Sequence, residues 1–270
     1  MSALIAGSIA AVIGVAVGLI MGLTGAGGGM LAVPALVYSQ GWTMQQAMPV
    51  ALLAVSFGAL IGAIDGLRRR QVRYKAATLM AIVGAPMTSF GVWVAKDMSQ
   101  TALMAAFSLV LMIVVFRLVR QVVLSPEEMI NQAAIALVNS STGRFDWNLK
   151  TAAVISVIGS CAGFATGMLG VGGGFIIVPL LRHFTNLSMQ SAAATSLMVI
   201  SLVGSVAVAS ALLHGAQLPL MFSVLFATAS VSGVLLGRRV ANFLPSKTVQ
   251  LIFAGMLFLV AISFIWKILR

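Results

Sequence analysis

Charged residues are scarce in this sequence. Only 8% of the 270 residues are charged, whereas an average soluble domain carries about 25%. So few charges cannot cover a water-exposed surface, and lipid must therefore contact most of the exterior. The composition excludes a soluble globular protein and predicts an all-α integral membrane protein whose main partner is the lipid bilayer.

Acidic residues are scarcer still. The chain has 5 Asp and Glu against 16 Lys and Arg, which gives a formal net charge of +11. In a soluble protein this balance would favour nucleic-acid binding. Here the basic residues lie between apolar runs, as at 68–75, so we interpret them as cytoplasmic loops and expect no nucleic-acid partner. The positive charge also raises the local concentration of anions.

Residues that would support catalysis, a metal or a nucleotide are missing too. Cys161 is the single cysteine and has no metal-ligand spacing. No cluster of His, Cys and carboxylates and no Ser–His–Asp arrangement can be argued. The glycine-rich stretch 25–30 lacks the last glycine of the dinucleotide fingerprint, and the chain has no phosphate-loop Gly-Lys-Ser or Gly-Lys-Thr. We therefore expect no enzyme activity, no cofactor, no metal and no ATP coupling within this chain.

What the sequence does contain is an internal repeat. The stretch 22–34 (GLTGAGGGMLAVP) matches 167–179 (GMLGVGGGFIIVP) at an offset of 145 positions with no gap. Chance would not keep one offset over more than forty residues, so the chain consists of two homologous halves. We expect a first repeat at 1–122, a second at 149–270, and between them a cytoplasmic connector at 123–148 with a short interfacial helix.

Each half contains about five apolar segments. Most reach the roughly 20 residues needed to cross about 30 Å of hydrocarbon. The second segment of each half is too short and follows a glycine cluster, which predicts a glycine-rich re-entrant or broken helical hairpin. The segments run over 3–21, 28–40, 44–66, 74–95 and 99–120, then 149–169, 173–185, 188–213, 218–240 and 246–267.

The basic loops change places between the halves. The run 68–75 follows the third segment of the first half, whereas its counterpart at 214–217 has no Lys or Arg. After the fourth segment it is the second half that is basic, with Arg238, Arg239 and Lys247. Because basic loops stay cytoplasmic, this pattern predicts two inverted repeats.

The two glycine clusters are the strongest candidates for a substrate site. An interrupted helix exposes backbone N–H groups and points its positive end at the gap, so an anion is a natural ligand there. Close helix packing is the alternative interpretation, and we favour it for the other glycine ridges, Gly14-Gly18-Gly22 and Gly58-Gly62-Gly66. These ridges permit a homodimer without requiring one. The predicted substrate-facing residues are Thr24, Gly25, Gly27, Gly28, Gly29, Gly170, Gly172, Gly173 and Gly174.

Polar side chains within the apolar segments are the next candidates. Hydroxyls and amides can donate to an anion without the desolvation cost of a buried charge, although each is also a typical interhelix hydrogen-bonding group. Ionisable residues near membrane depth are few. Asp65 either pairs with the arginines that follow it or carries a coupled proton, and Arg182 and His183 are expected to attract an anion. The repeated polar pairs are Gln45 with Gln190 and Ser56 with Ser201.

The doubled glycine motif, 22–34 and 167–179, resembles that of the sulfite exporter TauE/SafE family of bacterial membrane transporters. The resemblance implies a multi-pass protein of the bacterial cytoplasmic (inner) membrane that exports sulfite or an organosulfonate such as sulfoacetate. It also implies secondary coupling. The residues themselves indicate a small anionic substrate moved by alternating access. A passive anion channel and a membrane-embedded enzyme or assembly factor of sulfur metabolism are the alternatives.

Overall fold

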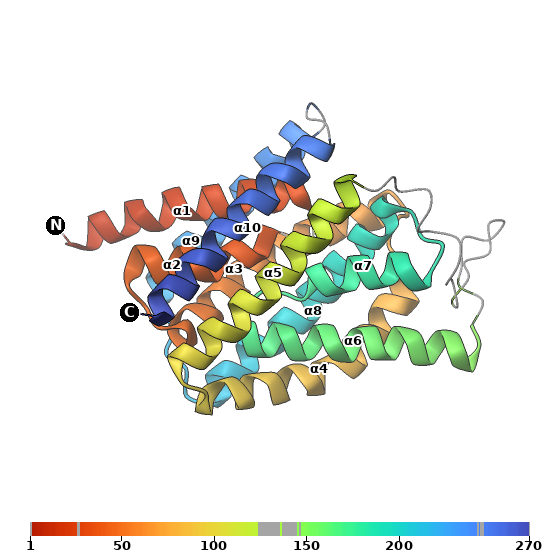
Figure 1. The fold of residues 1–270 in the computed structure, drawn as a ribbon, viewed down its shortest axis with the longest axis horizontal. Coiled ribbons are helices and arrows are strands. Elements are labelled where there is room, and N and C mark those ends of the chain that lie inside the picture. The colour runs from red at the N-terminus through yellow and green to blue at the C-terminus, as the bar shows by residue number, and fades with distance from the viewer. Residues whose placement is uncertain are drawn as a thin grey trace.

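The protein is a helical bundle, seen in a computed structural model (Figure 1). The structure describes residues 2–25, 28–123, 136, 145, 147–241, 243 and 246–269. Eight of the described helices are long and apolar enough to cross a membrane, which confirms the predicted all-α membrane fold. The elements are α1 (Ser2–Thr24), η1 (Gly28–Leu31), α2 (Ala32–Gln40), α3 (Met44–Arg68), α4 (Tyr74–Asp97), α5 (Gln100–Val123), α6 (Leu149–Leu169), α7 (Gly174–Phe184), α8 (Met189–Leu213), α9 (Leu220–Ala241) and α10 (Ser246–Leu269).

The short helices α2 and α7 do not span a bilayer. They contain 9 and 11 residues, which at about 1.5 Å per residue is roughly half of the hydrocarbon thickness. Gly25 and Gly170, which follow α1 and α6, have positive φ angles of 76° and 73°, a conformation that glycine adopts without strain. The chain then folds back, so that α2 packs beside α1 and α7 beside α6. Each pair forms a helical hairpin with one short arm.

The third helix of each half begins with an equivalent cap. The Thr43 side chain accepts from the Gln46 N–H and forms a capping box with it. At the equivalent position of α8, the Ser188 side chain accepts from the Ser191 N–H. Both helices contain 25 residues. The turns that follow also match, because Arg70 and Gly215 have φ angles of 57° and 87°. The offset of 145 positions therefore continues in the structure beyond the part of the repeat that the sequence displays.

Helices α3 and α8 form the centre of the bundle. Buried residues make up 72% and 56% of their apolar spans, against 28% for α4 and α5. Helix α3 packs on α8, and α5 packs on α10. Helix α1 packs on α9, just as α6 packs on α4. The first helix of each half thus contacts the fourth helix of the other half, and the two halves interlock.

Glycine ridges make these contacts close. A Cβ atom at Gly18 of α1 would lie 2.0 Å from the Ser230 carbonyl oxygen, and one at Gly163 of α6 would lie 2.3 Å from the Gly84 carbonyl oxygen. Only glycine lets the backbones approach so far. The ridge that includes Gly62 likewise faces α8. These ridges are used within the chain and do not offer a dimer surface.

The third helices of the two halves run in opposite directions. Gln45, at the start of α3, lines one pocket together with His214, just after the end of α8. Gly66, near the end of α3, lines a second pocket together with Gln190, at the start of α8. The two helices are therefore antiparallel neighbours.

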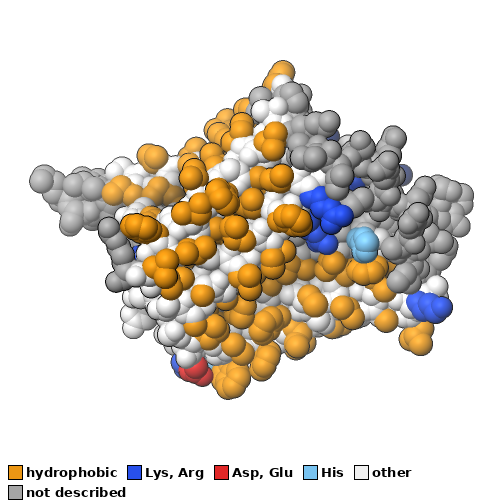
Figure 2. Space-filling model, viewed as in Figure 1, with side chains coloured by type: hydrophobic (Ala, Val, Ile, Leu, Met, Phe, Trp, Pro, Cys, Tyr) orange, Lys and Arg blue, Asp and Glu red, His pale blue; other side chains and the backbone are white. Residues whose placement is uncertain are grey.

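Hydrophobic side chains are spread over the surface, whereas charged ones are few. In the visible face, the hydrophobic side chains are scattered over most elements, and Lys or Arg side chains are seen right of centre, at the right-hand edge and, beside an acidic side chain, at the lower left (Figure 2). The interfacial helix predicted within 123–148 lies outside the described residues. Ala136 of this connector is described, and its N–H donates to the Phe184 carbonyl at 3.0 Å.

Candidate functional site

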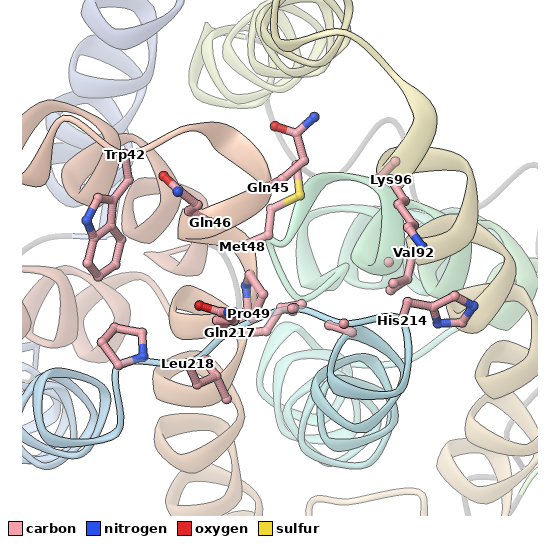
Figure 3. Close-up of a pocket in the computed structure, with 17 residues that line it drawn as sticks. Trp42, Gln45, Gln46, Met48, Pro49, Val92, Lys96, His214, Gln217 and Leu218 are labelled. Carbon is pink, nitrogen blue, oxygen red and sulfur yellow. The ribbon is translucent and has the colours of Figure 1, made fainter.

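A large pocket opens beside the starts of α3 and α9. It has a volume of about 650 Å³. Figure 3 shows Lys96 and His214 on one side of it and Trp42 and Leu218 on the other. We call it the larger pocket, and its lining is Trp42, Gln45, Gln46, Met48, Pro49, Leu52, Val92, Ala95, Lys96, Gly167, Ala211, His214, Gly215, Ala216, Gln217, Leu218 and Pro219.

Several polar side chains line the larger pocket. The Gln45 side-chain amide donates to the Met98 carbonyl at 2.9 Å, which ties the start of α3 to the end of α4. The His214 Nδ1 atom lies 2.7 Å from the Ser210 carbonyl oxygen. The Lys96 side chain is exposed and brings a positive charge to the rim. This lining, mostly apolar with a few polar groups and one cation, suits a small anion.

A second, smaller pocket lies at the opposite ends of the same central helices. Its volume is about 180 Å³. Much of its wall is glycine backbone, and its one charged side chain is Arg238. We call it the smaller pocket, and its lining is Met21, Gly22, Gly25, Gly58, Gly62, Gly66, Gln71, Gln190, Ala193, Ala194, Leu197, Val234 and Arg238.

The two pockets are equivalent places in the two halves. Many residues that line one are the repeat counterparts of residues that line the other. Arg238 and Val92 also correspond, because the backbone nitrogens of both lie 2.9 Å from a Cβ built on the matched glycines Gly22 and Gly167. The pairs at an offset of 145 are Gly22 with Gly167, Gln45 with Gln190, Met48 with Ala193, Pro49 with Ala194, Leu52 with Leu197, Gly66 with Ala211 and Gln71 with Ala216.

A packed layer separates the pockets. Along α3, the residues from 45 to 52 line the larger pocket and those from 58 to 66 line the smaller one. Val55 lies between the two sets. A Cβ at Gly29 would lie 3.0 Å from this valine, and one at Gly172 would lie 2.9 Å from it and 3.0 Å from Ile200, the repeat counterpart of Val55. Both glycine clusters thus meet in the layer that closes the path between the pockets.

Asp65 anchors an ion-pair network at the smaller pocket. Its carboxylate accepts a hydrogen bond from Nη2 of Arg238 on α9. It also pairs with Nε of Arg69, one turn further along α3, at 3.1 Å. Asp65 and Arg238 are about one-third exposed, at 34% and 33%, whereas Arg69 is 67% exposed. The predicted pairing of Asp65 with the arginines after it is present, and it reaches across to the second half as well.

The predicted glycine and serine residues divide between the pockets and the packed layer. Gly25 lines the smaller pocket. Gly28 packs on the backbone of Met21, so its role in the structure is close packing. Ser201 donates to the Met198 carbonyl. The remaining predicted glycines Gly170, Gly172, Gly173 and Gly174 are buried, Gly27 lies outside the described residues, and Ser56 is buried with no hydrogen-bond partner among the described atoms.

The other predicted polar residues have local roles. The Thr24 hydroxyl donates to the Ile20 carbonyl at 2.8 Å. His183 packs edge-on against the ring of Phe184. Arg182 contacts the sulfur of Met189 at 3.9 Å. None of the three lines either described pocket, and among the described residues no group of three or more His, Cys, Asp or Glu could hold a metal.

Sequence reasoning did not assign Arg238, Lys96 or His214 to a site. Arg238 was interpreted as part of a basic loop and 214–217 as the counterpart of the run 68–75, and nothing local distinguishes any of the three residues. One signal was available for His214, because the offset of 145 pairs it with Arg69. Arg238 could not be found in this way, because its counterpart is Val92 and the fourth helices follow a register shifted by one residue.

These features define a multi-pass helical membrane transporter with pockets at both ends of its central helices. The family model for the sulfite exporter TauE/SafE family matches residues 10–264. The chain therefore belongs to this family, which indicates a membrane transporter rather than an enzyme.

Curated relatives agree with this class. A probable membrane transporter protein, YunE of Bacillus subtilis (strain 168), is 23% identical over 95% of this chain and 96% of its own length. A probable membrane transporter protein of Xylella fastidiosa (strain 9a5c) is 27% identical over 93% of this chain and 92% of its own. The probable membrane transporter protein MamO of Magnetospirillum gryphiswaldense is 30% identical over 40% of this chain. No solved structure matches the chain.

Proposed function

We propose that this protein is a secondary transporter that exports a small sulfur-containing anion, sulfite or an organosulfonate such as sulfoacetate, by alternating access. The observation that carries the proposal is the pair of equivalent pockets, one of about 650 Å³ and one of about 180 Å³. A carrier built from inverted repeats exchanges the shapes of its halves, so that one pocket opens as the other closes. The sulfur-containing substrate rests on the family to which the chain belongs.

The sidedness follows from charge. The basic segment Arg68–Lys75 and the pair Arg238–Arg239 lie at the end of the bundle that holds the smaller pocket. The positive-inside rule places this end in the cytoplasm. The larger pocket then faces the outside, and the structure corresponds to the state in which an exported anion has left. The family and its bacterial members support placing the protein in the bacterial cytoplasmic membrane.

The predicted site residues acquire distinct roles in this scheme. Gln45 and Gln190 donate to the anion from equivalent places in the two pockets. Ser56 belongs to the packed layer, where its buried hydroxyl has no partner among the described atoms. It is free to bond the anion as the layer opens. Because removing an unpaired hydroxyl leaves no partner stranded, Ser56→Ala should slow transport without lowering thermal stability.

The test is transport by purified protein in liposomes. Liposomes that contain the protein are loaded with sulfite, sulfoacetate or thiosulfate and diluted into buffer free of these anions, with and without an imposed pH gradient. Loaded liposomes without protein are the control. A coupled carrier gives saturable efflux that changes with the gradient. Efflux that does not saturate and ignores the gradient would identify a passive channel. No efflux of any of the three anions would remove the proposed substrate class.

A further inference from the structure

The smaller pocket carries more positive than negative charge. Two guanidinium groups, those of Arg69 and Arg238, share the single carboxylate of Asp65. Asp97 is the other acidic residue among those described, and it lies at the far end of α4, next to the larger pocket. Basic side chains at this end of the bundle, which also include Arg68 and Arg239, thus outnumber the acidic ones in the described part of the chain.

Arg238 is placed to hold an oxyanion. Its side chain is 33% exposed and lines a pocket whose wall includes several glycines and alanines, so few bulky side chains stand in the way of a ligand. The pocket volume of about 180 Å³ accommodates a small oxyanion with a few waters, since each water takes about 30 Å³. The planar guanidinium fork binds oxyanions in bidentate fashion. Gln71 and Gln190 line the same pocket and add amide donors.

Asp65 has a second partner to which it can return. When its carboxylate leaves Arg238, it keeps the ion pair with Arg69 on its own helix. Breaking an ion pair is usually costly because it leaves a charge without a partner. Here the Asp65 carboxylate keeps Arg69, and the Arg238 guanidinium gains the incoming anion. The carboxylate is itself a small oxyanion bound to Arg238, and it is therefore a built-in stand-in for a ligand of that chemistry.

We propose that Arg238 is the oxyanion-binding residue of the smaller pocket and that the Asp65 carboxylate is bound to Arg238 in the absence of substrate. An incoming sulfite or sulfonate group displaces the carboxylate, Asp65 retains Arg69, and the ion pair that joins α3 to α9 is released. This inference rests on the proposed function for its substrate class. The larger pocket has no equivalent ion pair, because Ser210 and Val92 occupy the positions that correspond to Asp65 and Arg238.

The test is anion binding to the purified full-length protein, measured by isothermal titration with sulfite, sulfoacetate and acetate. Asp65→Asn removes the competitor and should tighten binding of these anions about tenfold. Asp65→Ser, which installs the residue that the second half carries at this position, should do the same. Asp97→Asn is the control for a general charge effect, since it makes the same charge change beside the larger pocket. It should tighten binding by less than either Asp65 variant.

The double variant Asp65→Asn with Arg238→Gln decides whether Arg238 is the binding residue. In this double variant the gain in affinity should vanish. Asp65→Asn with Arg238→Lys should keep only part of the gain, because an ammonium group lacks the planar guanidinium fork. The inference is overturned if neither Asp65 variant binds more tightly than Asp97→Asn, or if the gain survives loss of Arg238. Transport by the unaltered protein is scored separately, so sulfite efflux without tighter binding would refute the site and leave the proposed function standing.

Discussion

The close approach of α1 and α9 makes Gly18→Ala a sharp test of the packing. The added Cβ would lie 2.0 Å from the Ser230 carbonyl oxygen, against 3.4 Å for an ordinary contact, so the helices must separate by about 1.4 Å. Overpacking of this kind costs about 1–3 kcal/mol, while alanine recovers up to ~1 kcal/mol of helix propensity. We expect a net loss of roughly 1–2 kcal/mol and a lower melting temperature.

Gly255→Ala on α10 is the matched control. No atom lies within 4 Å of a Cβ built there, so this variant should melt at or slightly above the temperature of the unaltered protein. Thermal unfolding is followed by tryptophan fluorescence for all variants in one detergent. Gly163→Ala, the repeat counterpart of the test variant, should be destabilised alongside it because its Cβ would lie 2.3 Å from a carbonyl oxygen. If Gly18→Ala melts with the control or above it, the interlocked packing described here is incorrect.

Two further predictions concern the pockets. In a Cys161→Ala background, Ala216→Cys should react with a bulky thiol reagent far faster than its counterpart Gln71→Cys. Both positions are partly buried, but their pockets measure about 650 and 180 Å³; equal rates would contradict an outward-open state. Building the missing ion pair into the larger pocket with Val92→Arg and Ser210→Asp should slow labelling at Ala216→Cys, whereas Val92→Arg alone should slow it less. No difference between the single and double variants would show that an ion pair does not hold a pocket closed.

The sequence was sufficient to predict the helical segments because the signals that define them are local. Apolar length, the glycine motif and the Thr43 and Ser188 caps each act within a few residues, and the predicted segments match the helices closely. The pockets depend instead on how far helices splay, which no local pattern encodes. The partnership of Asp65 with Arg238 joins residues 173 positions apart, and the repeat gave no hint of it because neither residue has a charged counterpart.

The glycine clusters show why a motif can be found and still be misread in its details. Their density predicted exposed backbone N–H groups around a central cavity, but Gly29 and Gly172 meet at Val55 in a packed layer. A carrier needs such a layer, because a path open to both sides at once would dissipate every gradient. Because glycine has no side chain, the two hairpins can pack closely in this layer. For the same reason, no bulky side chains have to move past one another when the hairpins separate. In the proposed alternating-access cycle, close packing in the present state and contact with substrate in another are therefore compatible uses of the same residues.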